Sequence, residues 1–547
     1  MATQMPPGTV RLTGGPDEKI ILHPKPTDDY DDPLNWSTRR KTLHFGIVVI
    51  YVCMTFFLVD MPQVAIPYLQ RDLFISDEEL SLGRTLNFVG LGLGGICLIP
   101  LAYRYGRRPI YLLSALIQVP AAIWLGNVTS KYEFFVSSFL VSFGAAVTQT
   151  LVPMTITDMF FIHQFATMNG WFLFSQGTGS FLGQVVTGFI VQNHGWRWAW
   201  RCAAILLSFT FFVMLFMLEE STFVPLAPNE DGKVHDEELF FNRPFSYGST
   251  TDGHDPIDLV DINRTMAAPA QAQADTQTPS LPPRPKTLRQ RFALVTATKR
   301  PIQRRFLAPF VILCTFPAVA YAAVTYGATM AWLTMCYHVA ARKLVATPYN
   351  FNSRDMGLFG LAPFIGHTIG SLAIPALSDI WIVKLARQNG GIYHPEMRLR
   401  LAIPAGVVTW AGILFFGLAA ANDAPWIVLA VSFGIFGFGF AICLDVALAY
   451  VTDCYHNMIG DTLVGIVFVR NVLNVVVSVG IIPWMNSMGL QNTFILASST
   501  AAVILLIPVL LIRWGQKARG NTAAKYERYS LDAIPPASLK KLLAGRG

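Results

Sequence analysis

The sequence predicts an all-α membrane protein whose twelve transmembrane helices form two six-helix bundles. Of its 547 residues, 53% are hydrophobic and only 14% are charged. In soluble proteins about a quarter of the residues are charged. Twelve apolar runs are each long enough to cross the hydrocarbon core of a bilayer, which is roughly 30 Å thick. A long polar segment in the middle of the chain leaves six of these runs on either side of it.

The apolar runs define the expected organisation of the chain. The tail of 1–43 is polar, so we expect most of it to be disordered. It shows no cleavable signal, so we expect the first apolar run to be a retained helix. The first bundle covers 44–218, and its spans lie near 44–66, 84–103, 109–127, 134–156, 167–190 and 198–218. After a central loop of 219–305, the second bundle covers 306–513, with spans near 306–335, 355–378, 400–421, 425–451, 462–485 and 491–513. A tail of 514–547 follows.

Basic residues indicate which side of the membrane is cytoplasmic. Twelve spans bring both tails and the central loop to one side, and short loops rich in Lys and Arg stay in the cytoplasm. That side carries most of the basic loop residues, which are Arg104, Arg107, Arg108, Lys384, Arg387, Arg398, Arg400 and the basic tail from Arg513. The exceptions that fall outside are Arg197, Arg342 and Lys343. The formal charge of +7 therefore fits orientation in a lipid bilayer, and we expect no nucleic-acid partner.

Matching residues recur at matching depths in the two halves. Gly90 and Gly94 precede Leu101 at the same offsets as Gly366 and Gly370 precede Leu377. Asp158, Thr167 and Gly170 have the same spacing as Asp453, Thr462 and Gly465. The two aspartates each end a span at the cytoplasmic face. This repeat supports two parallel bundles with a cavity between them, and the glycines are expected to let neighbouring helices pack closely.

The link between the second and third spans is a tight basic turn. Gly106 permits a reversal with positive φ, and Pro109 suits the first turn of the next helix. The segment 101–109 resembles the signature loop of major facilitator superfamily transporters, with Arg104, Gly106, Arg107 and Arg108 matching and Tyr103 in place of an aspartate. At the matching position of the second half the acidic residue is present, as Asp379. The resemblance implies a cytoplasmic gate formed by Arg104, Gly106, Arg107, Arg108, Asp158, Asp379 and Asp453, in which Arg107 or Arg108 pairs with Asp158 in the outward-open state.

Other segments are similar to fungal members of the same superfamily. They are 32–36 before the first helix, 385–391, 450–455 and the eleventh span with Arg470 and Asn471. Such members export drugs, polyamines and secondary metabolites, and some are importers. The resemblance implies the superfamily's fold and a drug:proton antiporter-like activity.

Ionisable residues deep in the spans are the candidates for the substrate path. A charge near the centre of a span costs about 2.5–3.5 kcal/mol on insertion scales, so it is expected to face a partner or water. For His367 we favour a hydrogen-bonded packing role over a proton carrier. The candidates are Asp60, His367, Asp445 and Arg470, with Gln149, Asn471 and Asn474 as polar neighbours.

Asp445 and Arg470 lie at similar depths from the cytoplasmic ends of the tenth and eleventh spans. At 1.5 Å per residue both lie roughly 10–12 Å deep, so neighbouring helices are expected to bring them together. Pairing would allow both charges to stay buried. Whether such a pair is structural or is linked to substrate or protons is left open.

No motif in the sequence indicates an enzyme. There is no phosphate-binding Gly-x-x-x-x-Gly-Lys-Ser/Thr loop, no metal-ligand cluster and no nucleophile with a base at suitable spacing, so we expect no cofactor and no metal. We interpret the chain as a secondary active transporter that exports a small organic molecule, such as a drug, toxin or secondary metabolite, by proton-coupled alternating access. The alternatives are a proton-coupled importer of a small nutrient and a transporter-like receptor that binds its ligand without moving it.

The topology also predicts a modification and a location. Asn127, Val128 and Thr129 form a glycosylation sequon on an outer loop, whereas the sequons at Asn35 and Asn263 face inward. We expect a multi-pass protein of the plasma membrane, with the vacuolar membrane as the alternative.

Overall fold

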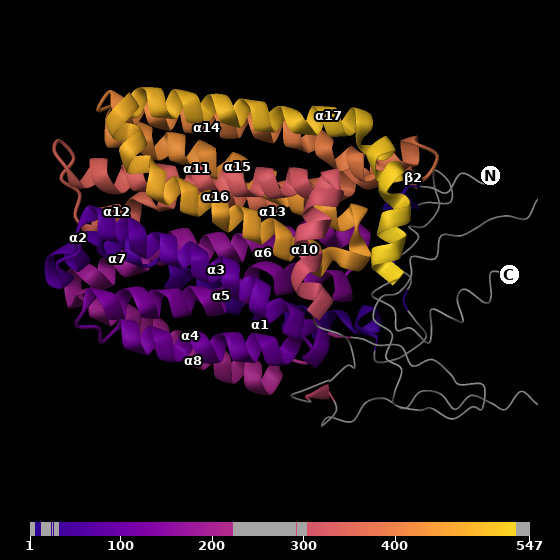
Figure 1. The fold of residues 1–547 in the computed structure, drawn as a ribbon, viewed down its shortest axis with the longest axis horizontal. Helices are drawn as coiled ribbons and strands as arrows, with labels where there is room; N and C mark the ends of the chain where they lie inside the picture. The colour runs from indigo at the N-terminus through magenta and orange to yellow at the C-terminus, as the bar shows by residue number, and fades with distance from the viewer. Residues whose placement is uncertain are drawn as a thin grey trace, which may run out of the picture.

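The computed structural model describes residues 6–12, 23–24, 26, 32–222, 291–292 and 303–531, and these are mostly helical (Figure 1). Most of the predicted central loop, and with it the sequon at Asn263, lies outside the described residues. All seven cysteines lie within them and are free, so the chain has no disulfide framework.

The first half contains the six predicted spans. A short 3-10 turn, η1 (Pro33–Asn35), precedes the first span, and η2 (Ile162–Gln164) precedes the fifth. The fifth span is interrupted by a π-helical turn, η3 (Thr178–Leu182). The spans are α1 (Thr38–Asp60) with α2 (Pro62–Leu73), α3 (Asp77–Tyr105), α4 (Arg107–Leu125), α5 (Lys131–Met159), α6 (Phe165–Gly177) with α7 (Gly183–His194), and α8 (Trp196–Met217).

The spans of the second half follow one another in the same order as those of the first. Two short segments, β2 (Ile392–Tyr393) and η4 (Pro395–Leu401), link its second and third spans, and η5 (His456–Met458) precedes the fifth. Its helices are α10 (Gln303–Thr315), α11 (Pro317–Val345), α12 (Ser353–Phe359) with α13 (Leu361–Gln388), α14 (Ala402–Ala421), α15 (Trp426–Cys454), α16 (Ile459–Met488) and α17 (Leu490–Leu531). Because α17 continues to Leu531, the beginning of the predicted C-terminal tail is helical.

The described helices account for the predicted membrane spans. Ten are long and apolar enough to cross a bilayer, and the bent pair α10 and α11 makes eleven. The remaining predicted span is α6–α7, whose glycines, glutamines and threonines make it less apolar. Large apolar side chains are exposed on the outward faces of α8 and α17, among them Ile205, Phe209, Phe216, Val503 and Leu506, as expected of surfaces that contact lipid.

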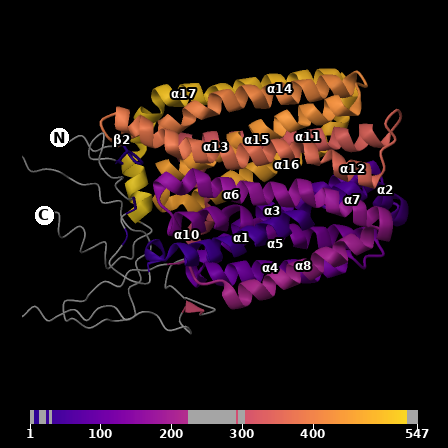
Figure 2. The same cartoon turned by 180° about the vertical axis from the view of Figure 1, so that it is seen from behind.

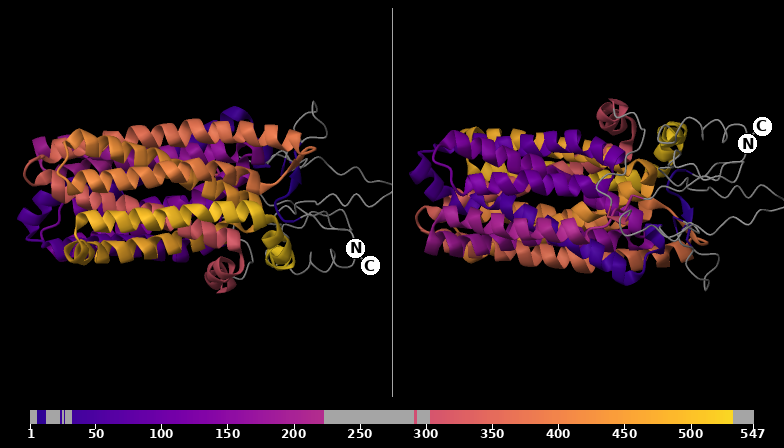
Figure 3. Two further views of the ribbon diagram at one scale, coloured as in Figure 1. Left: turned by 90° about the horizontal axis from the view of Figure 1, so that it is seen from above. Right: turned by 90° about the horizontal axis from the view of Figure 1, so that it is seen from below.

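The predicted seventh span of 306–335 is not a single straight helix. The chain bends by 96° between α10 and α11, at Phe316 and Pro317. Phe316 has φ −110° and ψ 110° because a residue before proline is pushed out of the helical region. Residues 303–315 therefore form a separate helix, and Figure 3 shows it beside the bundles at the end that carries β2.

The two halves lie side by side along their full length (Figures 1 and 2). Within them, α3 packs on α5, and α13 packs on α15. A Cβ on Gly94 would lie 2.1 Å from the carbonyl oxygen of Phe143, and one on Gly366 would lie 2.0 Å from that of Gly434. The predicted packing role of these glycines is therefore confirmed in both halves. Between the halves, α3 contacts α16, α6 contacts α13 and α7 contacts α12.

Capping boxes start the matching spans at the outer end. The Ser76 hydroxyl accepts from the Glu79 N–H (3.2 Å), and Glu79 accepts from the Ser76 N–H (3.1 Å). Asn352 and Asp355 make the same pair of bonds at the start of α12. These bonds satisfy N–H groups that the first helical turn leaves free, so both helices begin at defined residues.

Candidate functional site

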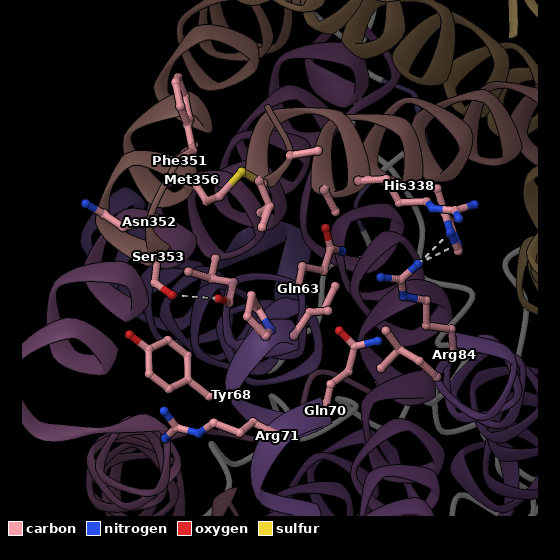
Figure 4. A pocket seen from close by; sticks show the side chains of 18 of the residues that line it. Gln63, Tyr68, Gln70, Arg71, Arg84, His338, Phe351, Asn352, Ser353 and Met356 are labelled. Carbon is pink, nitrogen blue, oxygen red and sulfur yellow. Dashed lines mark hydrogen bonds between the residues drawn. The ribbon is translucent and has the colours of Figure 1, made fainter. Parts of the chain in front are cut away.

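Two cavities lie between the halves, toward the end opposite the basic loop. The outer cavity has a volume of about 580 Å³ and is lined by residues of α2, α3, α11 and α12 (Figure 4). The deeper cavity has a volume of about 120 Å³. Both are lined by Gln63, Arg84 and His338, so these side chains separate the two spaces.

Arg84 and His338 form the constriction between the cavities. Nη1 of Arg84, on α3, lies 2.6 Å from Nε2 of His338, on α11. A guanidinium can only donate, so the imidazole that faces it accepts and is neutral. On the outer side Ser353 Oγ donates to the carbonyl oxygen of Val64 at 3.2 Å, which joins α12 to α2 (Figure 4). Both contacts join the first half to the second.

Asp60 and Arg470 face the deeper cavity from opposite halves. Asp60 ends α1 and accepts from Gln63 Nε2 (3.4 Å) and from Ser180. Arg470 lies on α16, is 3% exposed, and its guanidinium carbon lies 5.6 Å from the centre of the Tyr326 ring. The carboxylate and the guanidinium interact electrostatically across the cavity. Arg470 Nε and Nη1 have no hydrogen-bond partner among the described residues, so they are available to a ligand.

Two other predicted residues line the deeper cavity. Nε2 of His367, on α13, donates to the carbonyl oxygen of Leu173, on α6, at 2.8 Å. The ring packs directly against Gly177. Asn474 accepts from Thr334 Oγ1 (2.8 Å) and donates to the carbonyl oxygen of Arg470 (2.7 Å). His367 thus has the hydrogen-bonded packing contacts that we favoured for it.

Three of the predicted path residues lie away from the two cavities. Gln149 and Asn471 are buried, and their amide groups have no hydrogen-bond partner within the described part of the chain. Asp445 is 2% exposed and interacts with Arg398, Asp379 and Asp453. The predicted pair of Asp445 and Arg470 is therefore wrong, because the two charges point to different groups.

The basic loop is joined to the end of α5 by an ion pair. Arg107 Nη2 donates to Asp158 Oδ1 at 2.8 Å, and Nη1 contacts Oδ2. The predicted pairing of the loop with Asp158 is thus confirmed for Arg107. Gly106 has φ +99°, and a Cβ there would lie 2.5 Å from the Glu220 carboxylate, so only glycine fits. Glu220 accepts from the N–H groups of Arg107 and Arg108, the first residues of α4.

The other two basic residues of the loop point elsewhere. Arg108 Nη2 donates to the carbonyl oxygen of Leu215 at 2.7 Å, and Nη1 donates to that of Phe292. Arg108 therefore fastens the end of α8 to the loop. Arg104 is exposed, and its guanidinium carbon lies 5.5 Å from the centre of the Tyr105 ring.

A buried cluster occupies the corresponding place in the second half. The guanidinium of Arg398 is fully buried between Asp379 (Nη1 to Oδ1, 3.0 Å) and Asp453 (Nε to Oδ2, 2.8 Å). Tyr393 donates to Asp453 at 2.5 Å. Burial, with the negative charge of Asp453 beside it, raises the pKa of Tyr393 well above its ordinary value, so the phenol keeps its proton.

The two bundles contact each other at two places between the cavities and the end that carries the basic loop. At one, Asp379 Oδ2 accepts from the N–H (2.8 Å) and the hydroxyl (2.7 Å) of Thr167, in the first turn of α6. A carboxylate at a helix N-terminus is stabilised by the free N–H groups and the helix dipole. At the other, the Tyr103 hydroxyl lies against Gly460, in the first turn of α16. Arg305 lies 4.0 Å from the centre of the Tyr103 ring and pairs with Asp461 at 3.2 Å.

The sequence and the fold are similar to those of known proteins. Residues 48–458 match the family model of the Major Facilitator Superfamily. The chain belongs to the major facilitator superfamily. The family is one of transporters, so the protein is a multi-pass membrane transporter and not an enzyme. The family that the resemblance of segment 101–109 implied is thus confirmed.

Relatives of this superfamily member span almost its whole length. It is 25% identical over 524 residues to an uncharacterized MFS-type transporter of Schizosaccharomyces pombe, covering 93% of this chain and 90% of the relative. It is 23% identical over 465 residues to a probable efflux pump of Aspergillus flavus, covering 84% and 99%. A solved structure of the proton:xylose symporter XylE has the same fold, with a TM-score of 0.56, 13% identity, and coverage of 88% of this chain and 96% of that one.

Arg84, His338 and Arg398 belong to the site of this transporter, and none of them is predicted there from the sequence. Arg398 is predicted only as a cytoplasmic basic residue, because it precedes a span in a loop rich in arginine. Arg398 and Arg400 cannot be distinguished by the positive charge of the loop, yet Arg398 is fully buried and Arg400 is exposed. A useful signal was the repeat itself, since Asp379 and Asp453 need a cation in the place that Arg107 takes beside Asp158.

The sequon of this transporter gives a direct test of orientation. Asn127 is exposed at the end of α4, where its Nδ2 donates to the carbonyl oxygen of Ile123 (2.8 Å) and its Oδ1 accepts from Arg201 (2.9 Å). We expect a glycan on this amide, so Asn127→Gln and enzymatic deglycosylation should each increase gel mobility. If neither treatment changes mobility, the site is unused.

Proposed function

We propose that the protein exports a small organic molecule, such as a drug, toxin or secondary metabolite, in exchange for protons by alternating access. The observation that supports this most is the placement of Asp60 and Arg470 on opposite bundles around one cavity. Protonation of Asp60 would remove its attraction to Arg470 and so weaken one link between the bundles. A substrate bound to the free Arg470 nitrogens would compete with the same attraction.

The remaining lining of the deeper cavity favours a molecule with an apolar body and polar ends. Acceptors without a hydrogen-bond partner among the described residues are Asn87 Oδ1, Gln63 Oε1 and Gln176 Oε1. Aromatic rings make up much of the apolar wall, from Phe56, Phe88, Phe181 and Phe440. Such pockets bind mainly through apolar burial, and a few polar groups fix the orientation of the ligand.

The closed cytoplasmic end is consistent with one state of a transport cycle. Asp379 with Thr167, and Tyr103 with Gly460, join the bundles below the cavity. Above it, Arg84 and His338 form the constriction toward the outer cavity. We infer that the first set of contacts breaks when the cavity opens to the cytoplasm and the second when it opens outward. Export is favoured over import because a relative is described as a probable efflux pump.

The gate on the first bundle gives a measurable prediction. Asp158→Asn should slow transport about fivefold at unchanged surface expression, because a partly exposed ion pair is worth about 1 kcal/mol. Glu133→Gln, at the other end of α5, is the control and should leave the rate unchanged. The rate is measured per molecule at the cell surface. Equal rates for Asp158→Asn and wild type would remove this ion pair from the gating mechanism.

The proposal is tested by finding the substrate and then following its exchange. Metabolites are compared between cells that lack the protein and cells that overproduce it, and an exported molecule should accumulate inside the deletion cells. Counterflow of that molecule in proteoliposomes then separates a transporter from a receptor, since a receptor binds without exchange. A fluorescent fusion distinguishes the plasma membrane, which we propose, from the vacuolar membrane.

A further inference from the structure

Residues 6–12 form a turn followed by a short strand on the cytoplasmic face of the second bundle, and the turn is closed by a hydrogen bond from the Thr9 N–H to the carbonyl oxygen of Pro6 at 3.1 Å. The strand β1 (Val10–Arg11) pairs antiparallel with β2, Val10 opposite Tyr393 and Arg11 opposite Ile392. The Leu12 N–H donates to the carbonyl oxygen of Gly391 at 2.9 Å. Leu12 is 0% exposed and Val10 is 6% exposed, so both side chains belong to the core. Disorder was expected for most of the N-terminal tail, but this stretch is packed.

A buried arginine of α17 holds the same segment. Arg519 is 1% exposed and pairs with Glu396, Nε to Oε1 at 2.9 Å and Nη2 to Oε2 at 2.6 Å. Its Nη1 donates to the carbonyl oxygen of Pro7 and lies 3.5 Å from Thr9 Oγ1. Without the segment, this nitrogen of a buried cation would lose its protein acceptors, which is unfavourable.

The segment also contacts the end of α15, which carries Asp453. Gly8 has φ +81°, and a Cβ on it would lie 2.5 Å from the carbonyl oxygen of Asp453 and 2.9 Å from the Cα of Cys454. Only glycine can adopt this backbone conformation at so short a distance. Residues 6–12 therefore contact the cluster of Arg398, Asp379 and Asp453 at the backbone of Asp453.

A second short stretch of the N-terminal tail contacts the first bundle. The carbonyl oxygen of His23 accepts from the N–H of Ile162, in the link between α5 and α6, at 2.9 Å. His23 Nε2 in turn donates to the carbonyl oxygen of Arg11 at 3.1 Å. A chain of hydrogen bonds thus runs from β2 on the second bundle, through Arg11 and His23, to Ile162 on the first.

We propose that the cytoplasmic face of the second bundle is a binding site for the chain's own N-terminal segment 6–12, and that this segment acts as a latch on the closed cytoplasmic end. Opening to the cytoplasm separates Thr167 from Asp379 and so moves Ile162 away from β2. Either the bond from His23 to Arg11 or the one from His23 to Ile162 then breaks. The latch stabilises the inward-closed state by the free energy of these bonds and of the packing of Leu12.

The test measures the separation of the two bundles at the cytoplasmic end. Exposed residues at the ends of α1 and α13, Arg39 and Gln388, are replaced by cysteine for spin labelling, and the exposed Cys97 and Cys314 by serine. Double electron–electron resonance in lipid nanodiscs gives the populations of short and long distances. Loss of the latch should raise the ratio of long to short distances about tenfold, which corresponds to ~1.4 kcal/mol.

Two variants remove the latch in different ways. Deletion of residues 2–12 removes the segment itself, and Arg519→Gln removes the cation that holds the carbonyl oxygen of Pro7. Lys517→Gln, exposed two residues away on the same helix, is the matched control and should leave the distances unchanged. Melting temperatures of the purified proteins identify a variant that has lost its fold. If Arg519→Gln has, the deletion decides, since none of the described residues that it removes lies in a helix.

The outcomes separate the latch from the transport mechanism on which it rests. Thr167→Val, which removes a hydrogen bond to Asp379 between the two bundles, should also lengthen the distance. If Thr167→Val shifts the distribution but the deletion and Arg519→Gln do not, the latch is refuted and alternating access stands. If no variant shifts it, both proposals fail. A shift in the deletion and in Arg519→Gln, without one in Lys517→Gln, establishes the latch.

Discussion

Arg398→Leu should prevent the protein from accumulating in folded form. The guanidinium is the only positive charge that the described residues place between Asp379 and Asp453, and it is fully buried. Its removal leaves two carboxylates without a counter-ion in the interior, and breaking a buried ion pair from one side costs about 3–5 kcal/mol. The yield of monodisperse protein after detergent extraction is the measurement. Arg400→Leu, exposed on the same turn, should express normally.

Removal of all three charges should restore much of the yield. In Arg398→Leu/Asp379→Asn/Asp453→Asn the two carboxylates that pair with Arg398 are neutral as well, so most of the cost of the single change disappears. The triple variant should nevertheless transport slowly, because Asp379 is also the acceptor for the first turn of α6. Wild-type yield and melting temperature for Arg398→Leu alone would show that the cluster does not hold the second bundle together.

Asp60→Asn should abolish transport driven by a proton gradient while the protein still reaches the membrane. Asp60 is only partly buried and borders a cavity, so an amide of the same shape can replace the carboxylate without loss of packing. Arg470→Gln should impair substrate binding, because the two nitrogens that are free for a ligand belong to its guanidinium. Transport is assayed in proteoliposomes at matched protein content.

Asp60→Asn/Arg470→Gln distinguishes a functional pair from a structural one. If the two charges only hold α1 and α16 together, the double variant should recover what each single variant loses. We expect the pair to be functional, so the double variant should be expressed normally and show no gradient-driven transport. Normal transport by both single variants would mean that neither charge takes part in the cycle.

The positions of the spans could be predicted from the sequence, because length and hydropathy are sufficient to place a helix in a bilayer. The bend in the seventh span could not be predicted from hydropathy, since apolar composition continues through Phe316 and does not register the bend. The signal was present in Pro317, which restricts the residue before it. The pairing of Arg107 with Asp158 could be predicted because both residues end helices of one bundle at the same face.

Depth in the membrane does not say which way a side chain points. Asp445 and Arg470 have similar depths, but α15 packs on α13 and α14, whereas α16 packs on α3 and α11. Asp445 therefore faces the cluster of Arg398, and Arg470 faces Asp60 in the other bundle. The partner of Arg470 depends on how two halves of the chain dock, which no local pattern encodes.

The N-terminal segment shows that local composition also fails to predict which polar segments are ordered. Residues 6–12 contain two prolines, one glycine, two polar residues and only two apolar side chains, so their composition resembles that of a disordered tail. They are ordered because β2 offers a free strand edge and Arg519 offers a buried donor, and both lie hundreds of residues away.

The central claim is that Asp60 couples protons to the movement of a substrate between two bundles. Its most direct test compares counterflow with gradient-driven transport for wild type and Asp60→Asn in the same proteoliposomes, using the metabolite identified from deletion cells. Wild type should show both activities, and Asp60→Asn should keep counterflow, which needs no net proton movement, but lose transport driven by the gradient. Gradient-driven transport by Asp60→Asn at the wild-type rate, or binding without counterflow by wild type, would contradict the claim.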